Sequence, residues 1–144
     1  MVPLYALVIV TGLARLSGWL GVPWLDSWTH STQVGLAAMF LFTASAHFTQ
    51  PRRKLLIAMV PPRLPRAATL VTVTGVLELA GAVGLLVPPT ARLAAACLAV
   101  LMLVMFPANV RAAHADLGIK TMPLPLRTLV QLVFIAACAL VVAG

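Results

Sequence analysis

Glu78 is the residue in this chain whose position most needs a chemical explanation. It lies in the middle of an apolar run, residues 67 to 87, that is long enough to cross a bilayer. A carboxylate at the bilayer centre costs about 2.5 to 3.5 kcal/mol on insertion scales, so by default it marks a partner, a ligand or a proton path. We expect Glu78 to point into a helical bundle, because its helical face is mostly small. That face contains Ala67, Val71, Thr74, Gly75, Gly81, Ala82 and Leu85.

Arg15 and His47 are the charged or titratable side chains that could share a site with Glu78. Arg15 lies within about one helical turn of the depth of Glu78, so a buried structural pair and a ligand site that uses the same charges are both open. Glu78 and His47 are the candidate catalytic residues, since a carboxylate and an imidazole can act as acid and base. However, helical rise places Glu78 about 16 Å from the interface at which His47 lies. We therefore expect no direct contact between His47 and Glu78.

Asn109 is a third candidate ligand-binding residue, near the end of the fourth apolar run. It shares a helical face with Met102, Met105 and Phe106, which is compatible with an adaptable pocket for a flat or lipidic ligand but more often indicates plain helix packing.

The cysteines and histidines predict neither a redox relay nor a metal site. Cys97 and Cys138 form no C-x-x-C pair, and we interpret them as packing residues, although a disulfide between their helices is conceivable. His30, His47 and His114 lack the spacing of converging metal ligands, so no structural zinc is expected.

The composition places these residues in a membrane. Of 144 residues, 62% are hydrophobic and 9% are charged, and the mean hydropathy is +1.06, which a soluble core of this size could not hide. We predict one all-α membrane domain over residues 1–144, with five spans of about 17 to 21 residues each. The first run lacks the basic flank of a signal peptide and is taken as a span. The spans are roughly residues 2–22, 33–49, 67–87, 92–110 and 126–143.

The net charge of +7 is concentrated in two loops. By the positive-inside rule these loops are cytoplasmic, which places the N-terminus inside and the C-terminus outside the cell membrane. We read the charge as topogenic and as attractive to anionic lipid, not to nucleic acid. The first loop also predicts a short interfacial helix followed by an extended, proline-rich turn. The residues concerned are Arg52, Arg53, Lys54, Arg63 and Arg66 in one loop, and Arg111, Lys120 and Arg127 in or beside the other.

Several motifs in one order resemble the DoxX-like family of small polytopic membrane proteins. They are His47-Phe48, the run MVPPRLP at 59–65, the run GVLELAG at 75–81 and the run FPANV at 106–110. The resemblance covers about two thirds of the chain and implies a core of four helices, about residues 33–143, with one added N-terminal span. It also implies association with redox systems, because relatives include a subunit of a quinone-reducing complex. His47, Glu78 and Asn109 look like recurrent polar positions of that family.

The first functional hypothesis is a membrane subunit that holds a quinone or another apolar molecule near Glu78. A soluble or membrane-bound redox partner would dock on the basic cytoplasmic face, and His47 and Asn109 would line the entrance. The alternatives are a non-enzymatic scaffold or assembly factor and a standalone membrane enzyme that acts on a lipid-soluble substrate. A homo-oligomer is compatible with each of these, and a transporter would require one.

Overall fold

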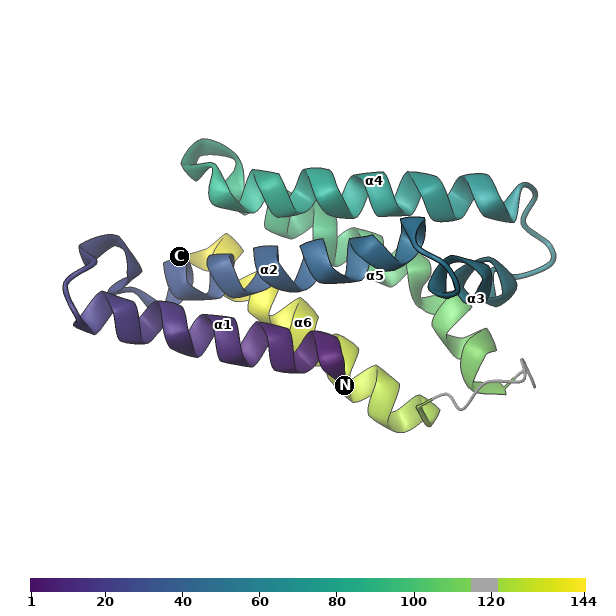
Figure 1. Cartoon of the computed structure of the whole chain (residues 1–144), viewed down its shortest axis with the longest axis horizontal. Helices are drawn as coiled ribbons and strands as arrows, with labels where there is room; N and C mark the ends of the chain where they lie inside the picture. Colours follow the sequence, from purple (N-terminus) through teal and green to yellow (C-terminus); the bar gives the residue numbers. More distant parts are fainter. Residues whose placement is uncertain (115–121) are drawn as a thin grey trace.

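The computed structural model describes residues 1–114 and 122–144, and within them the regular secondary structure is entirely helical. The basic residue Lys120 lies outside the described residues. Figure 1 shows long helices that run back and forth as an antiparallel bundle. The long helices are α1 (Val2–Trp19), α2 (Trp28–Phe48), α4 (Ala67–Leu86), α5 (Ala91–His114) and α6 (Leu124–Ala143). The short ones are α3 (Arg52–Met59) and the 3-10 turns η1 (Pro23–Leu25) and η2 (Pro88–Thr90).

The predicted all-α bundle is confirmed, and the helices lie close to the predicted runs. The main difference is α2, which begins at Trp28 rather than at residue 33. The predicted short helix after the second run is also confirmed, as α3. Prolines account for several boundaries, since Pro3, Pro23, Pro88 and Pro125 each lie in a first helical turn, where a missing N–H costs nothing.

α2 is the central helix of the bundle. It contacts α1, α4 and α6, and in Figure 1 it lies between α1 and α4. About half of its residues are buried, among them Leu36, Met39 and Phe40 in the apolar core. Gly35 allows α1 to approach, because a Cβ at that position would overlap Thr11.

Among the described residues, four helices are long and apolar enough to cross a membrane: α1, α4, α5 together with η2, and α6. α2 is as long, but its mean hydropathy is lower because it contains Ser31, Thr32, Gln33 and His47. These polar residues are buried inside the bundle. The outward faces of the other helices are apolar, with Val8, Val83, Val104 and Leu129 all more than half exposed. The chain is therefore a helical membrane protein, whose apolar surface matches a lipid environment.

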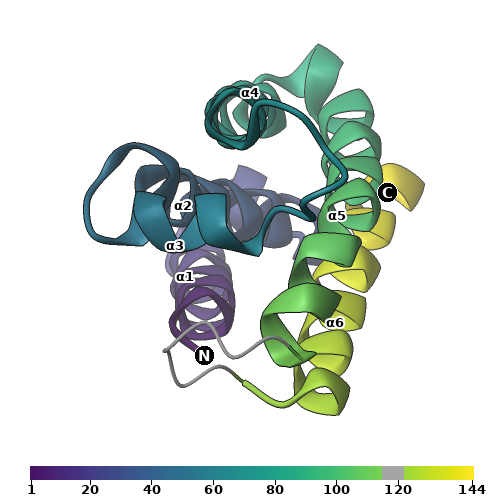
Figure 2. The same ribbon diagram turned by 90° about the vertical axis from the view of Figure 1, so that its right-hand side faces the viewer.

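Most of the basic residues lie at one end of the bundle, which we call the basic end. It comprises α3, the loop from Val60 to Arg66, the start of α4 and the facing ends of α5 and α6. Figure 2 looks onto this end and shows α3 below α4, reaching toward α5. Of the described Lys and Arg residues, only Arg15 and Arg92 lie elsewhere, and the C-terminal residue Gly144 lies at the opposite end, bound by Arg92.

Candidate functional site

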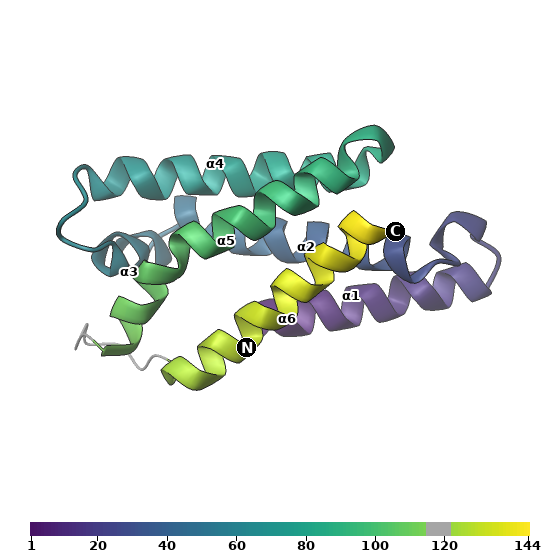
Figure 3. The same cartoon turned by 180° about the vertical axis from the view of Figure 1, so that it is seen from behind.

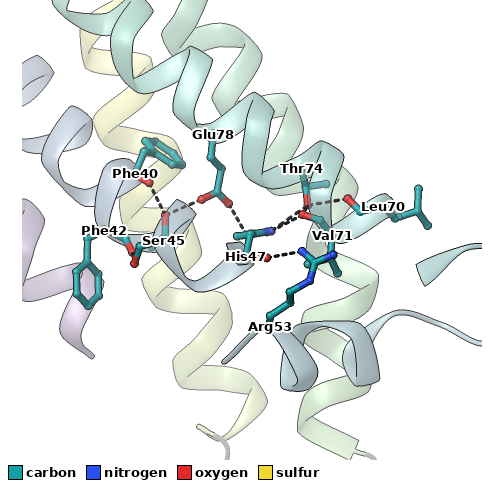
Figure 4. Close-up of polar contacts among 10 residues, drawn as sticks. Phe40, Phe42, Ser45, His47, Arg53, Leu70, Val71, Thr74 and Glu78 are labelled. Atoms are coloured by element: carbon teal, nitrogen blue, oxygen red, sulfur yellow. Dashed lines mark hydrogen bonds and ion pairs between the residues drawn. The ribbon is translucent and has the colours of Figure 1, made fainter. Parts of the chain in front are cut away.

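His47 and Glu78 are in contact, which corrects the expectation that depth keeps them apart. The His47 Nε2 lies 3.4 Å from the Glu78 Oε1, and both side chains are buried. Figure 4 shows the Glu78 carboxylate reaching from α4 toward the His47 ring on α2. The prediction that Glu78 faces the bundle interior is confirmed, because the buried residues of α4 are Val71, Gly75, Glu78, Ala82 and Leu85.

The depth estimate was wrong because it placed the ends of α2 and α4 at one level. In Figure 1 the first turns of α4 run past the end of α2, so His47 lies beside Gly75 and not beside Ala67. Eight residues of helix separate those two levels, about 12 Å by helical rise. In addition, helical side chains lean toward the N-terminus of their helix, which turns the Glu78 carboxylate toward His47.

Thr43 completes the carboxylate site, and sequence reasoning missed it. Its hydroxyl donates to the Glu78 Oε2 at 2.8 Å, so each oxygen of the carboxylate has a partner on α2. Thr43 and His47 are four residues apart on one helix and therefore share a face. That spacing in the sequence could have indicated that Thr43 lies at the same site as His47.

The other ring nitrogen of His47 is hydrogen-bonded to α4. Nδ1 lies 2.8 Å from the Val71 carbonyl oxygen and 3.3 Å from the Thr74 hydroxyl. A carbonyl oxygen can only accept, so Nδ1 carries a hydrogen and donates it to Val71. Nε2 then faces a carboxylate oxygen, and two lone pairs would repel each other. A hydrogen between Nε2 and Oε1 removes that repulsion and makes the contact a hydrogen bond.

Arg53 of α3 ties the end of α2 to the start of α4. It donates to the backbone carbonyl of His47, to the Ala68 carbonyl at 3.2 Å and to the Thr72 hydroxyl at 2.9 Å. A guanidinium suits this position because it presents several donors in one rigid plane. Arg53 thus holds the backbone that carries His47.

A small cavity of about 190 Å³ lies beside His47, among α3, the loop that follows it, α4 and α5. Its polar lining side chains are His47, Thr74 and Asn109, so Asn109 and His47 do border one space, while Glu78 lies behind His47. We call this space the His47 cavity. Arg111 holds one wall in place by donating to the Val60 carbonyl. The apolar lining comes from Leu56, Met59, Val60, Pro61, Leu64, Leu70, Val71, Val104, Met105, Pro107 and Ala108.

Asn109 belongs to a polar cluster between α5 and α6 that the sequence did not indicate. Its Oδ1 accepts from Arg127 at 2.9 Å, and its Nδ2 donates to the Gln131 Oε1 at 3.3 Å. Gln131 in turn donates to the Met102 carbonyl at 3.2 Å. Of the methionines expected beside Asn109, Met105 lines the His47 cavity. Arg127 and Gln131 are four residues apart, a spacing that could have paired them.

Arg15 is not the partner of Glu78, and that expectation is corrected. Its guanidinium binds the Asp26 carboxylate and lies over the rings of Trp19 and Trp28, at 5.1 Å and 5.4 Å from their centroids. α2 lies between α1 and α4, so Arg15 and Glu78 are on opposite sides of the central helix. Arg15 therefore anchors the turn after α1 through charge and cation–π contacts.

The two cysteines are free thiols, as expected. Cys138 is a buried packing residue, whereas Cys97 is exposed, so the packing interpretation is wrong for Cys97. In the described part of the chain no three His, Cys, Asp or Glu side chains gather in a way that could hold a metal ion.

Comparison with known protein families adds one match. The model of a domain of unknown function, DUF8561, matches residues 36–143. The chain belongs to the DUF8561 family. The match spans α2 from Leu36 onward through α6, so the family region contains His47, Glu78 and Asn109 and leaves out α1. DUF8561 is not connected to the DoxX-like proteins by this match, and that resemblance stays a prediction. Neither the curated proteins nor the solved structures contain a match.

Proposed function

We propose that this protein binds a quinone or a similar apolar ring compound in the His47 cavity and passes a proton to it through His47. The observation that carries the proposal is the placement of His47 between a buried carboxylate and an apolar cavity. Nε2 faces Glu78, and the partners of Nδ1, Val71 and Thr74, line the cavity. His47 itself lines the cavity, so the imidazole can take a proton from Glu78 at Nε2 and release its Nδ1 hydrogen to a ligand when the hydrogen bond from Nδ1 to Val71 opens.

The cavity supports a small, mostly apolar ligand. Its volume of about 190 Å³ is below the roughly 300 to 1,000 Å³ of sites for drug-sized ligands, so it suits one ring. The Asn109 Nδ2 donates one hydrogen to Gln131 and has a second hydrogen for a carbonyl oxygen of the ligand. A quinone has two such oxygens on a flat apolar ring.

The proposed reaction balances only with an external electron donor. Reduction of a quinone to a quinol takes up two electrons and two protons, and the electrons would come from a redox partner. The basic end would bind a partner with an acidic surface. Its exposed basic residues are Arg52, Lys54, Arg63 and Arg66. We also propose that this end is cytoplasmic, by the positive-inside rule, and that the chain is a distant relative of the DoxX-like proteins.

The experiment is to identify small molecules that co-purify with the protein in mild detergent. We expect a quinone in extracts of the wild-type protein, with less in the Glu78→Gln and His47→Ala variants. Ala108→Phe, which fills the cavity from α5 and leaves both residues of the pair in the sequence, should also lose the quinone, whereas Gly12→Ala on α1 should keep it. Extracts that contain only phospholipid for all variants would refute the proposal.

A scaffold without ligand chemistry is the second candidate. It is favoured by the hydrogen bonds of Thr43, Arg53 and Asn109, which fix the register of the helices without any ligand. A stable partner that is captured equally by the wild-type protein and by Glu78→Gln would favour the scaffold over the quinone site.

A further inference from the structure

A second and larger hollow runs along the exposed, apolar side of α4 and α5. It encloses about 620 Å³, and its lining is almost entirely apolar. We call it the α4–α5 groove. Figure 3 shows α5 beside α4 near η2 and turning away from it toward the basic end. The lining residues are Leu77, Ala80, Gly81, Gly84, Thr90, Leu93, Ala94, Cys97, Leu98, Val100, Leu101 and Val104.

Val104 lines both the groove and the His47 cavity, so the two spaces are neighbours. From Val104 the groove extends along α5 to Thr90 at the end of η2, a length of about 21 Å by helical rise. That length is more than half of the roughly 30 Å hydrocarbon thickness of a bilayer. Small residues on both helices leave the space for it, notably Ala80 and Gly84 on α4 and Ala94 on α5.

We propose that the α4–α5 groove holds the hydrocarbon tail of the molecule whose ring occupies the His47 cavity. The inference rests on the proposed function and defines its ligand as a tailed, membrane-soluble ring compound. The cavity is too small for a ring and a long tail together, and the neighbouring groove shares Val104 with it. The groove offers no charged side chain, so it suits a tail but not a second polar head.

A phospholipid fits the two spaces less well than a tailed ring compound. Its charged headgroup would have to enter a cavity lined mainly by apolar residues, at the cost of leaving water. A helix of a second copy could also cover the groove, because small residues favour close helix contacts. Both alternatives are outcomes of the experiment below.

Cys97 provides a direct measure of occupancy, because it lines the groove and is exposed, whereas Cys138 is buried. The experiment measures the rate at which a maleimide labels Cys97 in detergent-purified protein. Two probes are compared, tetramethylbenzoquinone and the same ring with one methyl group replaced by a decyl chain. Both rings are fully substituted, so neither offers an open ring position to a thiol.

We expect both probes to bind the wild-type protein, in competition with each other, but only the decyl probe to protect Cys97. At a concentration ten times its Kd, protection should slow labelling about tenfold, because about one protein in eleven is then free. Val100→Trp, which narrows the groove, should weaken the binding of the decyl probe and leave the binding of the tetramethyl probe unchanged. Leu129→Trp, on the exposed face of α6, should change neither.

The outcomes separate the two proposals. If both probes bind but neither protects Cys97, or if Val100→Trp weakens both equally, the tail assignment is overturned and the ring site stands. If neither probe binds, the proposed function fails and the tail assignment fails with it. Protection of Cys97 by added phospholipid, or protection that rises with protein concentration alone, assigns the groove to bulk lipid or to a second copy and also overturns it.

Discussion

Gly75 on α4 lies directly against His47 on α2. A Cβ at Gly75 would lie 2.5 Å from the His47 Cβ and 3.0 Å from the Phe48 ring. The Cβ and Cγ of His47 and the ring of Phe48 occupy that space, and the His47 Cβ cannot give way without moving its helix. The absence of a side chain at residue 75 is therefore what lets the two helices close on the His47–Glu78 pair.

Gly75→Ala tests that close approach. We expect the variant to lose about 1 to 3 kcal/mol of stability, because an added methyl group overpacks the contact between α2 and α4. The measurement is unfolding in detergent, followed by exposure of the buried Cys138. Gly12→Ala is the control, since nothing lies within 4 Å of its added Cβ, and it should be neutral or slightly stabilising. Equal stability of the two variants would contradict the packing.

The contact between His47 and Glu78 predicts an energetic coupling. In a double-mutant cycle with His47→Ala and Glu78→Ala, we expect an interaction energy of about 0.5 to 3 kcal/mol, because each change alone leaves the other group buried without its partner. Equilibrium unfolding of the four proteins gives the value. A cycle of Glu78→Ala with Asp26→Ala should be additive, since Asp26 binds Arg15 on the far side of α2. Additivity in the first cycle would argue against the pair.

Arg53 should contribute more to stability than its neighbours in the sequence. Arg53→Ala removes donors from the His47 carbonyl and the Thr72 hydroxyl, and we expect a loss of about 1 to 3 kcal/mol. Lys54→Ala is the matched control on the same helix, where Lys54 is exposed, and should change stability by less than about 0.5 kcal/mol. Thermal unfolding of the wild-type protein and both variants measures these losses of stability. A loss of equal size in Lys54→Ala would point to general charge removal instead.

The two thiols should differ in reactivity. Cys97 is exposed and Cys138 is fully buried, so a maleimide should add once to the native protein and twice after unfolding. Intact-mass measurement counts the additions. Two rapid additions to the native protein would mean that α6 does not pack as described around Cys138.

The sequence was sufficient for the helices and for the orientation of Glu78. Long apolar runs and the small face around Glu78 are local properties, and proline positions mark several helix starts. The pairing of His47 with Glu78 was not predictable from depth, because the stagger of α2 against α4 depends on how the loop between them folds. Gly75 was a usable signal for the stagger, since a glycine permits a neighbouring helix to approach closely at the level of the glycine.

The partners of Arg15 and Asn109 could not be predicted either, because they depend on which helices pack together. Arg15 was compared with Glu78 by depth alone, whereas Asp26 lies only eleven residues away along the chain. The choice between them depends on which helix lies between α1 and α4, and this is a property of the whole bundle. Likewise, Asn109 meets Gln131 and Arg127 only because α5 and α6 pack together.

The polar residues buried in α2 have a consequence for how the protein enters its membrane. Ser31, Thr32, Gln33 and His47 are sheltered in the finished bundle, but a helix that enters lipid alone would expose them. We expect α2 to insert poorly as an isolated segment and efficiently when α1 precedes it, so that the two enter as a hairpin. Glycosylation mapping of α2 with and without α1 measures this, and equal insertion in both cases would refute it. The centre of the bundle would then be built by a helix that depends on its neighbours to enter the membrane.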